Sequence, residues 1–192
     1  MRSIFKKIWK LALPYQDKRT DKGHAAITLK FALELLKKEK ACPEIVIPAI
    51  ILHDTGYSQL SKHERFLPFI LKVKMESAED KKAKTKHQAK SVELARKILK
   101  KINYDEELTK EILKIIAQHD TGKTIISKED GLVKDADKLW RFSKTGFLAD
   151  LRRLEMSHQK GYERLKNALI DKRFFFSKTA KKIAKERLKK LK

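Results

Sequence analysis

Residues that interrupt regular secondary structure are rare in this sequence, and their scarcity limits the fold more than any other feature. The 192 residues include 6 glycines and 4 prolines. Sheet-rich folds need frequent turns, and turns use these two residue types heavily, whereas long helices need few of them. No stretch of the sequence makes a convincing strand. We therefore predict an all-α fold, organised as a single helical bundle.

Composition narrows the class of protein further. Hydrophobic residues make up 41% of the chain, which is enough to build a core. Cys42 is the single cysteine, so an intrachain disulfide and a cysteine-based zinc site are excluded, and a reducing compartment is the default. No apolar run reaches the length of about 18 residues that a membrane helix needs. Residues 1–13 alternate lysines with apolar residues, unlike a signal peptide. We expect a cytoplasmic protein.

The chain is strongly basic. Lys and Arg total 47 against 25 Asp and Glu, which gives a formal net charge of +22. Such a balance favours anionic partners, which include nucleic acids, nucleotides and acidic membranes. Residues 177–192 form a basic tail with two interpretations. In the first, which we favour, the tail is an amphipathic helix that packs its apolar residues and leaves its lysines in solvent; in the second, it recruits nucleic acid or membrane. The apolar residues in question are Ile183, Ala184, Leu188 and Leu191.

Apolar residues at helical spacing predict helices along most of the chain. We expect them over residues 4–13, from an Asp21 cap to about residue 40, and over 43–52, 60–73, 87–101, 104–120 and 128–142, with one or two in 146–169 and a last one in the tail. The charged segment 75–86 has no apolar stripe, so a loop is predicted there. Residues 45–52 are apolar on every side, which is typical of a helix buried in the core.

His53 and Asp54 follow this buried segment directly. An unpaired carboxylate in apolar surroundings is costly, so Asp54 requires a cation, which is either a basic side chain or a metal ion. The adjacent imidazole favours a metal, because imidazole and carboxylate ligands suit Fe, Mn, Zn, Co and Ni. The alternative is an ordinary helix end, at which His53 caps carbonyl groups and Asp54 begins a turn.

The order and context of several residues resemble the HD superfamily of metal-dependent phosphohydrolases. Residues 49–57, Ala-Ile-Ile-Leu-His-Asp-Thr-Gly-Tyr, resemble the family signature, an apolar helix that ends in Leu-His-Asp-x-Gly. Residues 132–139 resemble the helix that supplies the last aspartate. The resemblance covers about residues 20–146. It implies one HD domain over 1–192, with a metal-binding core at about 20–146 and a C-terminal helical extension at about 147–192 that ends in the basic helix.

The resemblance also implies which residues would bind a first divalent metal: His24, His53, Asp54 and Asp135. HD-GYP cyclic-dinucleotide phosphodiesterases and HD-type diadenosine tetraphosphate hydrolases add two histidines that bind a second metal, and the HD aspartate bridges both. His87 and His119 fall at the corresponding places here. Residues 115–123 are similar to the His-x-Thr-Gly segment of the second branch. Other HD phosphohydrolases keep one metal, so one or two divalent transition metals remain open.

Departures from the family patterns narrow the branch. Residues 55–57, Thr-Gly-Tyr, follow the His-Asp pair, where HD-GYP proteins usually have a lysine at the last place, and no Gly-Tyr-Pro triplet occurs in the chain. The Glu-Asp pair that alarmone hydrolases carry after the His-Asp pair is also missing. These differences argue against both assignments.

We therefore expect a phosphohydrolase that acts on a nucleotide or a related small phosphate ester, with Asp54 and His53 at its catalytic centre. A divalent ion lowers the pKa of bound water and supplies hydroxide near neutral pH. Candidates for binding the phosphate are Lys123, Lys138 and Arg19. Asp120 and Asp137 either orient histidines or face solvent.

Two alternatives stay open. The first is a non-catalytic module that binds RNA or a nucleotide and holds a structural metal, which the net charge motivates. The second is an enzyme that uses the same site on nucleic-acid ends, steered there by the basic tail. Neither the substrate, the metal nor the oligomeric state follows from the sequence.

Overall fold

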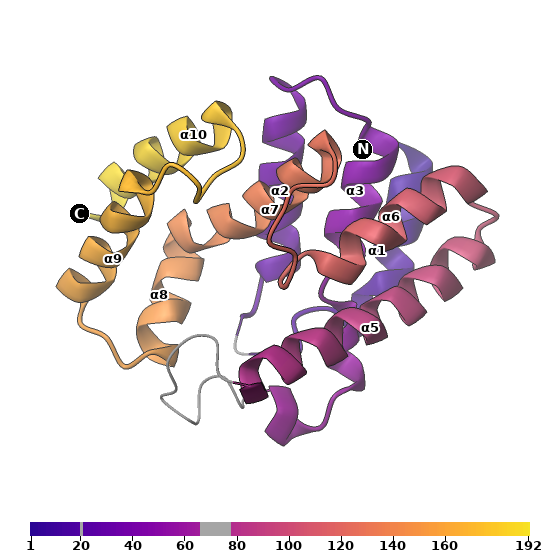
Figure 1. The fold of residues 1–192 in the computed structure, drawn as a ribbon, viewed down its shortest axis with the longest axis horizontal. Helices are drawn as coiled ribbons and strands as arrows, with labels where there is room; N and C mark the ends of the chain where they lie inside the picture. The colour runs from indigo at the N-terminus through magenta and orange to yellow at the C-terminus, as the bar shows by residue number, and fades with distance from the viewer. Residues whose placement is uncertain (20, 66–77) are drawn as a thin grey trace.

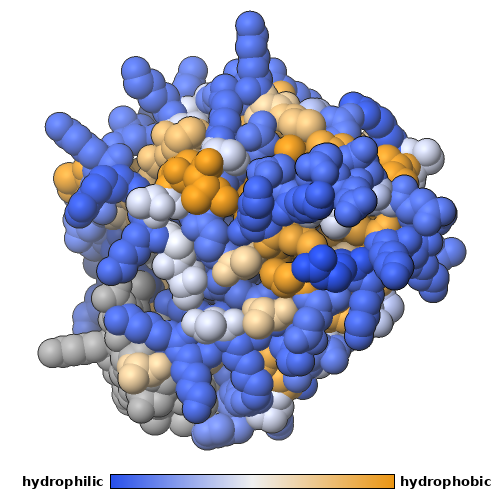
Figure 2. Space-filling view, turned by 45° about the vertical axis from the view of Figure 1, so that its right-hand side comes forward, coloured by the Kyte–Doolittle hydropathy of each residue, from blue (hydrophilic) through white to orange (hydrophobic). Residues whose placement is uncertain are grey.

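The computed structural model describes residues 1–19, 21–65 and 78–192. Over these residues the chain forms helices and connecting segments without a β-strand, which confirms the predicted all-α fold (Figure 1). None of the described helices combines the length and the apolar character that a bilayer crossing requires. Hydrophilic side chains cover most of the face in Figure 2, and apolar ones appear there in small separate groups.

The elements follow one another in the order that hydrophobic spacing predicts for most of the chain. They are α1 (Ser3–Ala12), η1 (Leu13–Tyr15), α2 (His24–Leu36), α3 (Pro43–Leu52), η2 (Thr55–Gln59), α5 (Ala78–Lys101), α6 (Glu106–Gln118), α7 (Lys128–Leu139), η3 (Trp140–Phe142), α8 (Lys144–Arg153), α9 (His158–Ile170), α10 (Lys178–Leu188) and η4 (Lys189–Leu191).

Helix α3 lies at the centre of the bundle. It contacts α1, α2, α6 and α7, and residues 46–52 are all buried. A helix surrounded in this way needs apolar side chains on every face, which explains its composition. Pro43 opens the helix and Pro48 lies inside it without ending it. Because α3 ends at Leu52, His53 and Asp54 lie directly after this buried helix, at the edge of the core.

Helix α5 corrects the loop predicted for residues 75–86, because it begins at Ala78. Its first turns are rich in Ala and Lys, which are strong helix formers and need no continuous apolar stripe. Ala83 and His87, one turn apart, are the positions that face inward there. His87 therefore lies inside a helix instead of opening one. Of the helix predicted over residues 60–73, residues 62–65 are helical, and residues 66–73 lie outside the described part, as do residues 75–77 of the predicted loop.

The start of α2 also differs from the prediction, since Asp21 does not cap it. The N-cap is Gly23, in the left-handed region at φ +86°. The Asp17 carboxylate accepts hydrogen bonds from the backbone N–H groups of Gly23, at 2.8 Å, and Ala25, at 3.0 Å. Asp21 instead accepts from the Nε–H of Arg19 at 3.2 Å. This turn fixes His24 as the first residue of the helix, which ends at Leu36 and not near residue 40.

Helix α7 lies between the N-terminal helices and the group formed by α8, α9 and α10 (Figure 1). The predicted packing of the tail is confirmed, because its apolar residues Ile183, Ala184, Leu188 and Leu191 are buried. Most of its lysines remain exposed. Phe5 of α1 and Leu191 of η4 belong to the same cluster of buried apolar residues. The two ends of the chain therefore share one core.

Candidate metal centre

Histidines and aspartates from five helices and their ends converge beside the C-terminal end of α3. His24 begins α2, the pair His53 and Asp54 follows α3, and His87 lies on α5. The pair His119 and Asp120 follows α6, and Asp137 lies in the last turn of α7. Most of these side chains lie at helix ends, so the positions at which the helices begin and end bring them together.

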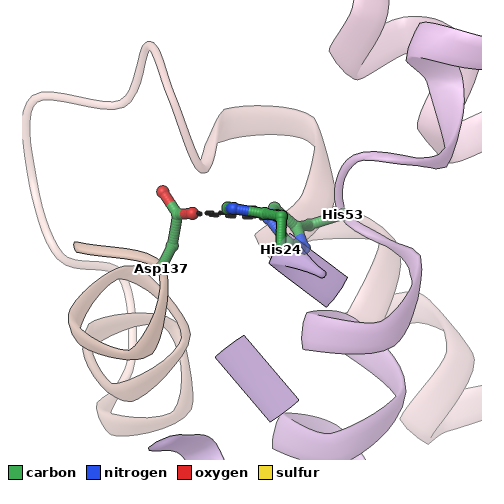
Figure 3. A group of neighbouring side chains, drawn as sticks. All are labelled: His24, His53 and Asp137. Carbon is green, nitrogen blue, oxygen red and sulfur yellow. Dashed lines mark hydrogen bonds and ion pairs between the residues drawn. The ribbon is translucent and has the colours of Figure 1, made fainter. Parts of the chain in front are cut away.

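The first group contains His24, His53 and Asp137, whose side chains point toward one another in Figure 3. The Nε2 atoms of the two histidines are 3.3 Å apart. The Oδ1 atom of Asp137 is 3.2 Å from Nε2 of His24 and 3.6 Å from Nε2 of His53. The Oδ2 atom of Asp54 completes the group, at 3.4 Å and 3.6 Å from the same two nitrogens.

The second group lies on the other side of Asp54. The Nε2 atoms of His87 and His119 are 3.2 Å apart. The Oδ1 atom of Asp54 is 3.3 Å from Nε2 of His119 and 3.6 Å from Nε2 of His87, and Oδ2 of Asp120 is 3.5 Å from Nε2 of His87. One carboxylate, that of Asp54, thus gives one oxygen to each group.

These separations fit the donor sets of metal ions. Adjacent ligand atoms that lie about 2.0–2.2 Å from one ion are about 2.8–3.6 Å from each other in tetrahedral or octahedral arrangements. The Nδ1 atoms of His53 and His119 donate to the carbonyl oxygens of Ile50 and Ile116, each at 2.8 Å. Such bonds fix the tautomer and leave the Nε2 lone pair facing the site. The residues present therefore fit divalent metals held by imidazole and carboxylate groups.

The surroundings keep Asp54 ionised. Its burial alone would raise the pKa of this carboxyl, but the neighbouring histidines, His53 first, and Arg19 lower it well below its usual value. For Asp137, burial is likewise outweighed by hydrogen bonds from His24 and His53, so its pKa is also well below normal. Both carboxylates are thus in the form that binds a cation.

The pKa values of the histidines differ according to their charged neighbours. Burial and the nearby His119 lower the pKa of His87 to about 4, so its imidazole is neutral at physiological pH. Burial would also lower the pKa of His53, but Asp54 and Asp137 raise it to about 9. In the metal-free protein, a proton on His53 therefore supplies positive charge to these two carboxylates. A bound metal ion would take over this role.

Aromatic stacking and close packing hold His87 in place. The ring of Tyr57 stacks on its imidazole, with centroids 4.1 Å apart and planes 9° from parallel. The backbone N–H of Gly56 donates to Oγ of Ser91 at 2.8 Å, and a Cβ at Gly56 would overlap the His87 carbonyl oxygen and the Ser91 backbone nitrogen. Helix α5 can approach η2 this closely because residue 56 has no side chain.

The structure brings five of the six predicted metal ligands together and places the sixth, Asp135, elsewhere. The Asp135 carboxylate accepts from the backbone N–H groups of Phe176 and Ser177, each at 2.8 Å, and so fixes the turn into α10. Asp137 occupies the place predicted for Asp135. Two residues correspond to about 200° around a helix, so the two carboxylates face opposite sides. From this placement we propose Asp137, in place of Asp135, as the ligand that α7 supplies.

The three predicted phosphate-binding residues lie in different places. Lys138 lines a pocket beside the cluster, together with His53 and His119. Arg19 lines a small hollow on the other side, where its Nη1 donates to the Tyr57 hydroxyl at 2.7 Å. Lys123 is exposed in the segment after α6 and is absent from the described lining of both cavities.

Sequence reasoning left the roles of Asp120 and Asp137 open, and the structure places both carboxylates against the histidine nitrogens. The signal for Asp120 was its position directly after His119, which repeats the arrangement of His53 and Asp54. For Asp137, the signal was the Asp-x-Asp spacing, which allows one of the two carboxylates to face the site.

Comparisons with known proteins agree with this geometry. The family model of the HD domain matches residues 22–141, which is more than half of the chain and includes every residue of the cluster. A search of curated proteins and a search of solved structures each return no match. With its paired His-Asp residues, its all-α fold and this match, the chain belongs to the HD-domain family, whose superfamily comprises metal-dependent phosphohydrolases.

Proposed function

We propose that this protein is a phosphohydrolase with two adjacent metal sites, which hydrolyses a nucleotide or a related small phosphate ester. The observation that carries the proposal is the position of Asp54, whose Oδ2 lies against His24 and His53 while its Oδ1 lies against His87 and His119. A single structural metal would need one such group. Membership of the HD-domain family supplies the reaction class.

Each proposed site has two imidazoles and two carboxylate oxygens. The ligands of the first site are His24, His53, Asp54 and Asp137, and those of the second are His87, His119, Asp54 and Asp120. Mixed nitrogen and oxygen donors suit Fe, Mn, Zn, Co and Ni. We therefore propose two divalent transition metals per chain, with Asp54 shared between them.

Divalent metals in such sites activate water near neutral pH and neutralise charge on a phosphoryl group. The chain's own residues orient the reaction. Asp54 would give one oxygen to each site, and the hydrogen bonds from Nδ1 of His53 and His119 to backbone carbonyl oxygens hold both imidazoles in place. Lys138 lines the adjacent pocket and would supply positive charge to a phosphate bound there. The overall reaction adds water across a P–O bond.

The test combines metal analysis with turnover. Protein purified without chelator, and reloaded if needed, is expected to contain about two moles of transition metal per mole of chain. It should hydrolyse a panel of nucleotides and phosphodiesters at many turnovers per chain. In Asp54→Asn the neutral amide cannot balance two cations, so we expect metal content below one and activity reduced by about 100-fold or more.

Glu93→Gln is the matched control, because it makes the same change on the exposed face of α5. It should leave both quantities unchanged. Stoichiometric metal without turnover on any phosphate ester would contradict the proposal and favour a binding module. Full activity in Asp54→Asn would show that the site is wrong.

A further inference from the structure

His87 differs from His119, the other histidine of the second group, in how its ring is held. Nδ1 of His119 donates to the Ile116 carbonyl oxygen at 2.8 Å. Nδ1 of His87 is buried and has no hydrogen-bond partner among the residues that the structure describes. A histidine that binds a metal usually takes its orientation from a hydrogen bond at its second nitrogen. The orientation of His87 therefore depends on other contacts.

The ring of Tyr57 supplies such a contact, and Arg19 lies against the same ring. The Tyr57 ring is almost parallel to the His87 imidazole, with centroids 4.1 Å apart. Cζ of Arg19 lies over the Tyr57 ring, 4.4 Å from its centroid. Tyr57 is buried, so the ring has little space in which to move. Tyr57 thus contacts a histidine of the second group and an arginine at the same time.

Arg19 is itself fixed by hydrogen bonds within the protein. Its Nη1 donates to the Tyr57 hydroxyl at 2.7 Å, and its Nε donates to Oδ2 of Asp21 at 3.2 Å. The Asp21 side chain is buried, and its carbonyl oxygen accepts from the backbone N–H of His24 at 2.8 Å. A chain of contacts therefore runs from the turn that begins α2, through Arg19 and Tyr57, to His87.

The space around Arg19 does not suit a phosphate group. The hollow that Arg19 lines has a volume of about 10 Å³, which is about the space of one water molecule. Asp21 and Asp54 also line it, and their carboxylates would repel a phosphate. The larger pocket, which Lys138 lines, does not include Arg19 in its described lining. These observations favour a role for Arg19 in holding the protein's own side chains.

We propose that Arg19 and Tyr57 are positioning residues for the second metal site, and that Arg19 acts on His87 through the ring of Tyr57. This inference rests on the proposed function, because it requires a metal bound by His87. Neither residue is a ligand. The ring of Tyr57 does for His87 what the backbone carbonyl oxygen does for His119, and Arg19 keeps this ring in place.

The positive charge of Arg19 makes the direction of the effect informative. Arg19 lines the same hollow as Asp54, the ligand that the two proposed sites share, and a guanidinium near a bound cation repels it. If charge were its only influence, the neutral side chain in Arg19→Gln would raise metal affinity. If Arg19 holds Tyr57 against His87, the same substitution lowers metal affinity, because the imidazole loses its fixed orientation.

The test measures the two metal affinities of the full chain, with Co²⁺ in competition with a chromophoric chelator. Tyr57→Phe keeps the ring and loses the hydroxyl. In this variant and in Arg19→Gln, we expect one Kd to rise about threefold or more, as the loss of one hydrogen bond predicts. In Tyr57→Leu, which removes the ring, the same Kd should rise at least about tenfold. The other Kd should not change, and His119→Gln identifies which Kd belongs to the second site.

Two further measurements separate positioning from a general loss of stability. In the double variant Arg19→Gln/Tyr57→Phe, the second Kd should be no higher than in the weaker single variant, because both substitutions break the same contact. The visible absorption of Co²⁺ in the second site should change in Tyr57→Leu, because it depends on the geometry of the ligands. Urea denaturation shows that each variant is folded.

Tyr104→Phe and Arg187→Gln are the matched controls, because each breaks a comparable contact elsewhere in the fold. The Tyr104 hydroxyl donates to the Glu44 carbonyl oxygen at 2.7 Å. Cζ of Arg187 lies over the Phe31 ring, 5.6 Å from its centroid. Neither control should change either Kd.

An unchanged or lower second Kd in Arg19→Gln would overturn the inference, as would additive losses in the double variant. If Tyr57→Leu does not fold, Arg19→Gln and Tyr57→Phe still decide. Two metals in the wild-type chain, with the same affinities in these variants, would remove this inference alone and leave the proposed function intact. A wild-type chain that takes up no second metal would contradict both.

Discussion

At the scale of single residues, Asp135 and Asp137 contact different groups although one residue separates them: Asp137 lies against histidines and Asp135 against backbone N–H groups. Asp137→Asn removes a carboxylate from His24 and His53, so metal affinity is expected to fall at least about tenfold. Asp135→Asn should keep the metals but destabilise the fold by about 1–3 kcal/mol, because the backbone groups of Phe176 and Ser177 lose a charged acceptor. Metal titration and urea denaturation of both variants measure the two effects.

The two variants are each other's controls, since each exchanges a carboxylate for an amide on α7. The opposite result, with metal lost from Asp135→Asn and kept by Asp137→Asn, would restore the assignment that the sequence favoured. Retention of full metal affinity by both variants would remove α7 from the centre altogether.

The same pair shows what periodicity can and cannot predict about a site. Sequence context located His24, His53, Asp54, His87 and His119, and the structure brings them together. Within α7 it favoured Asp135, whereas the structure places Asp137 against the histidines, and this helix is buried on almost every side. The apolar pattern of such a helix therefore does not tell which of the two carboxylates faces the site. Contacts with α2 and α10, which are distant in sequence, decide which carboxylate faces the histidine cluster.

At the scale of elements, the close contact between η2 and α5 positions the second site. Gly56→Ala would force the two elements apart, because its Cβ would overlap the His87 carbonyl oxygen. We expect a loss of about 1–3 kcal/mol in unfolding free energy. Metal should also be lost selectively from the second site, because His87 shifts while His24 and His53 do not. Urea denaturation and metal stoichiometry measure these effects.

Gln59→Ala, an exposed position in the same 3-10 segment, is the control and should change neither quantity. Equal loss from both sites in Gly56→Ala would mean that the sites are not filled independently. Unchanged metal content would mean that α5 does not set the position of His87.

Element boundaries were the part of the fold that sequence predicted least well. The buried helix α3 and the amphipathic helix α6 were predicted almost as they are, because burial leaves a strong apolar pattern. The start of α5 was missed because a solvent-exposed helical segment rich in Ala and Lys carries almost no such pattern. Helix propensity, and not periodicity, is the signal that could have found it.

At the scale of the whole molecule, the shared core determines how the basic tail packs, whereas the net charge determines which partners the surface favours. The cluster of buried residues extends from Phe5 to Leu191, so the basic tail is part of the fold. Its apolar spacing predicted this packing. The formal charge of +22 is a property of the surface, and it favours anionic partners without identifying one.

The metal centre also couples global stability to pH, because its residues come from α2, α5 and α7 and from the ends of α3 and α6. In the metal-free protein the pKa of His53 is raised to about 9 by Asp54 and Asp137, against the effect of burial. The pKa of His119 is raised as well, because the hydrogen bond to Asp54 and the charge of Asp120 outweigh burial. A raised histidine pKa stabilises the folded state fully below the unfolded value of about 6.5, and this stability is lost as pH rises through the folded value.

The metal-free protein is therefore expected to melt at progressively lower temperature between about pH 6.5 and pH 9. The metal-loaded protein should behave differently, because metals bind deprotonated imidazoles and replace the proton as counter-charge for Asp54 and Asp137. The gap in Tm between loaded and chelated protein should then widen over this pH range. Thermal denaturation followed by circular dichroism, with and without chelator, measures it. In His53→Gln the decline of the metal-free protein should be reduced, and a gap that is constant or narrows toward pH 9 would show that metals do not replace the proton of His53.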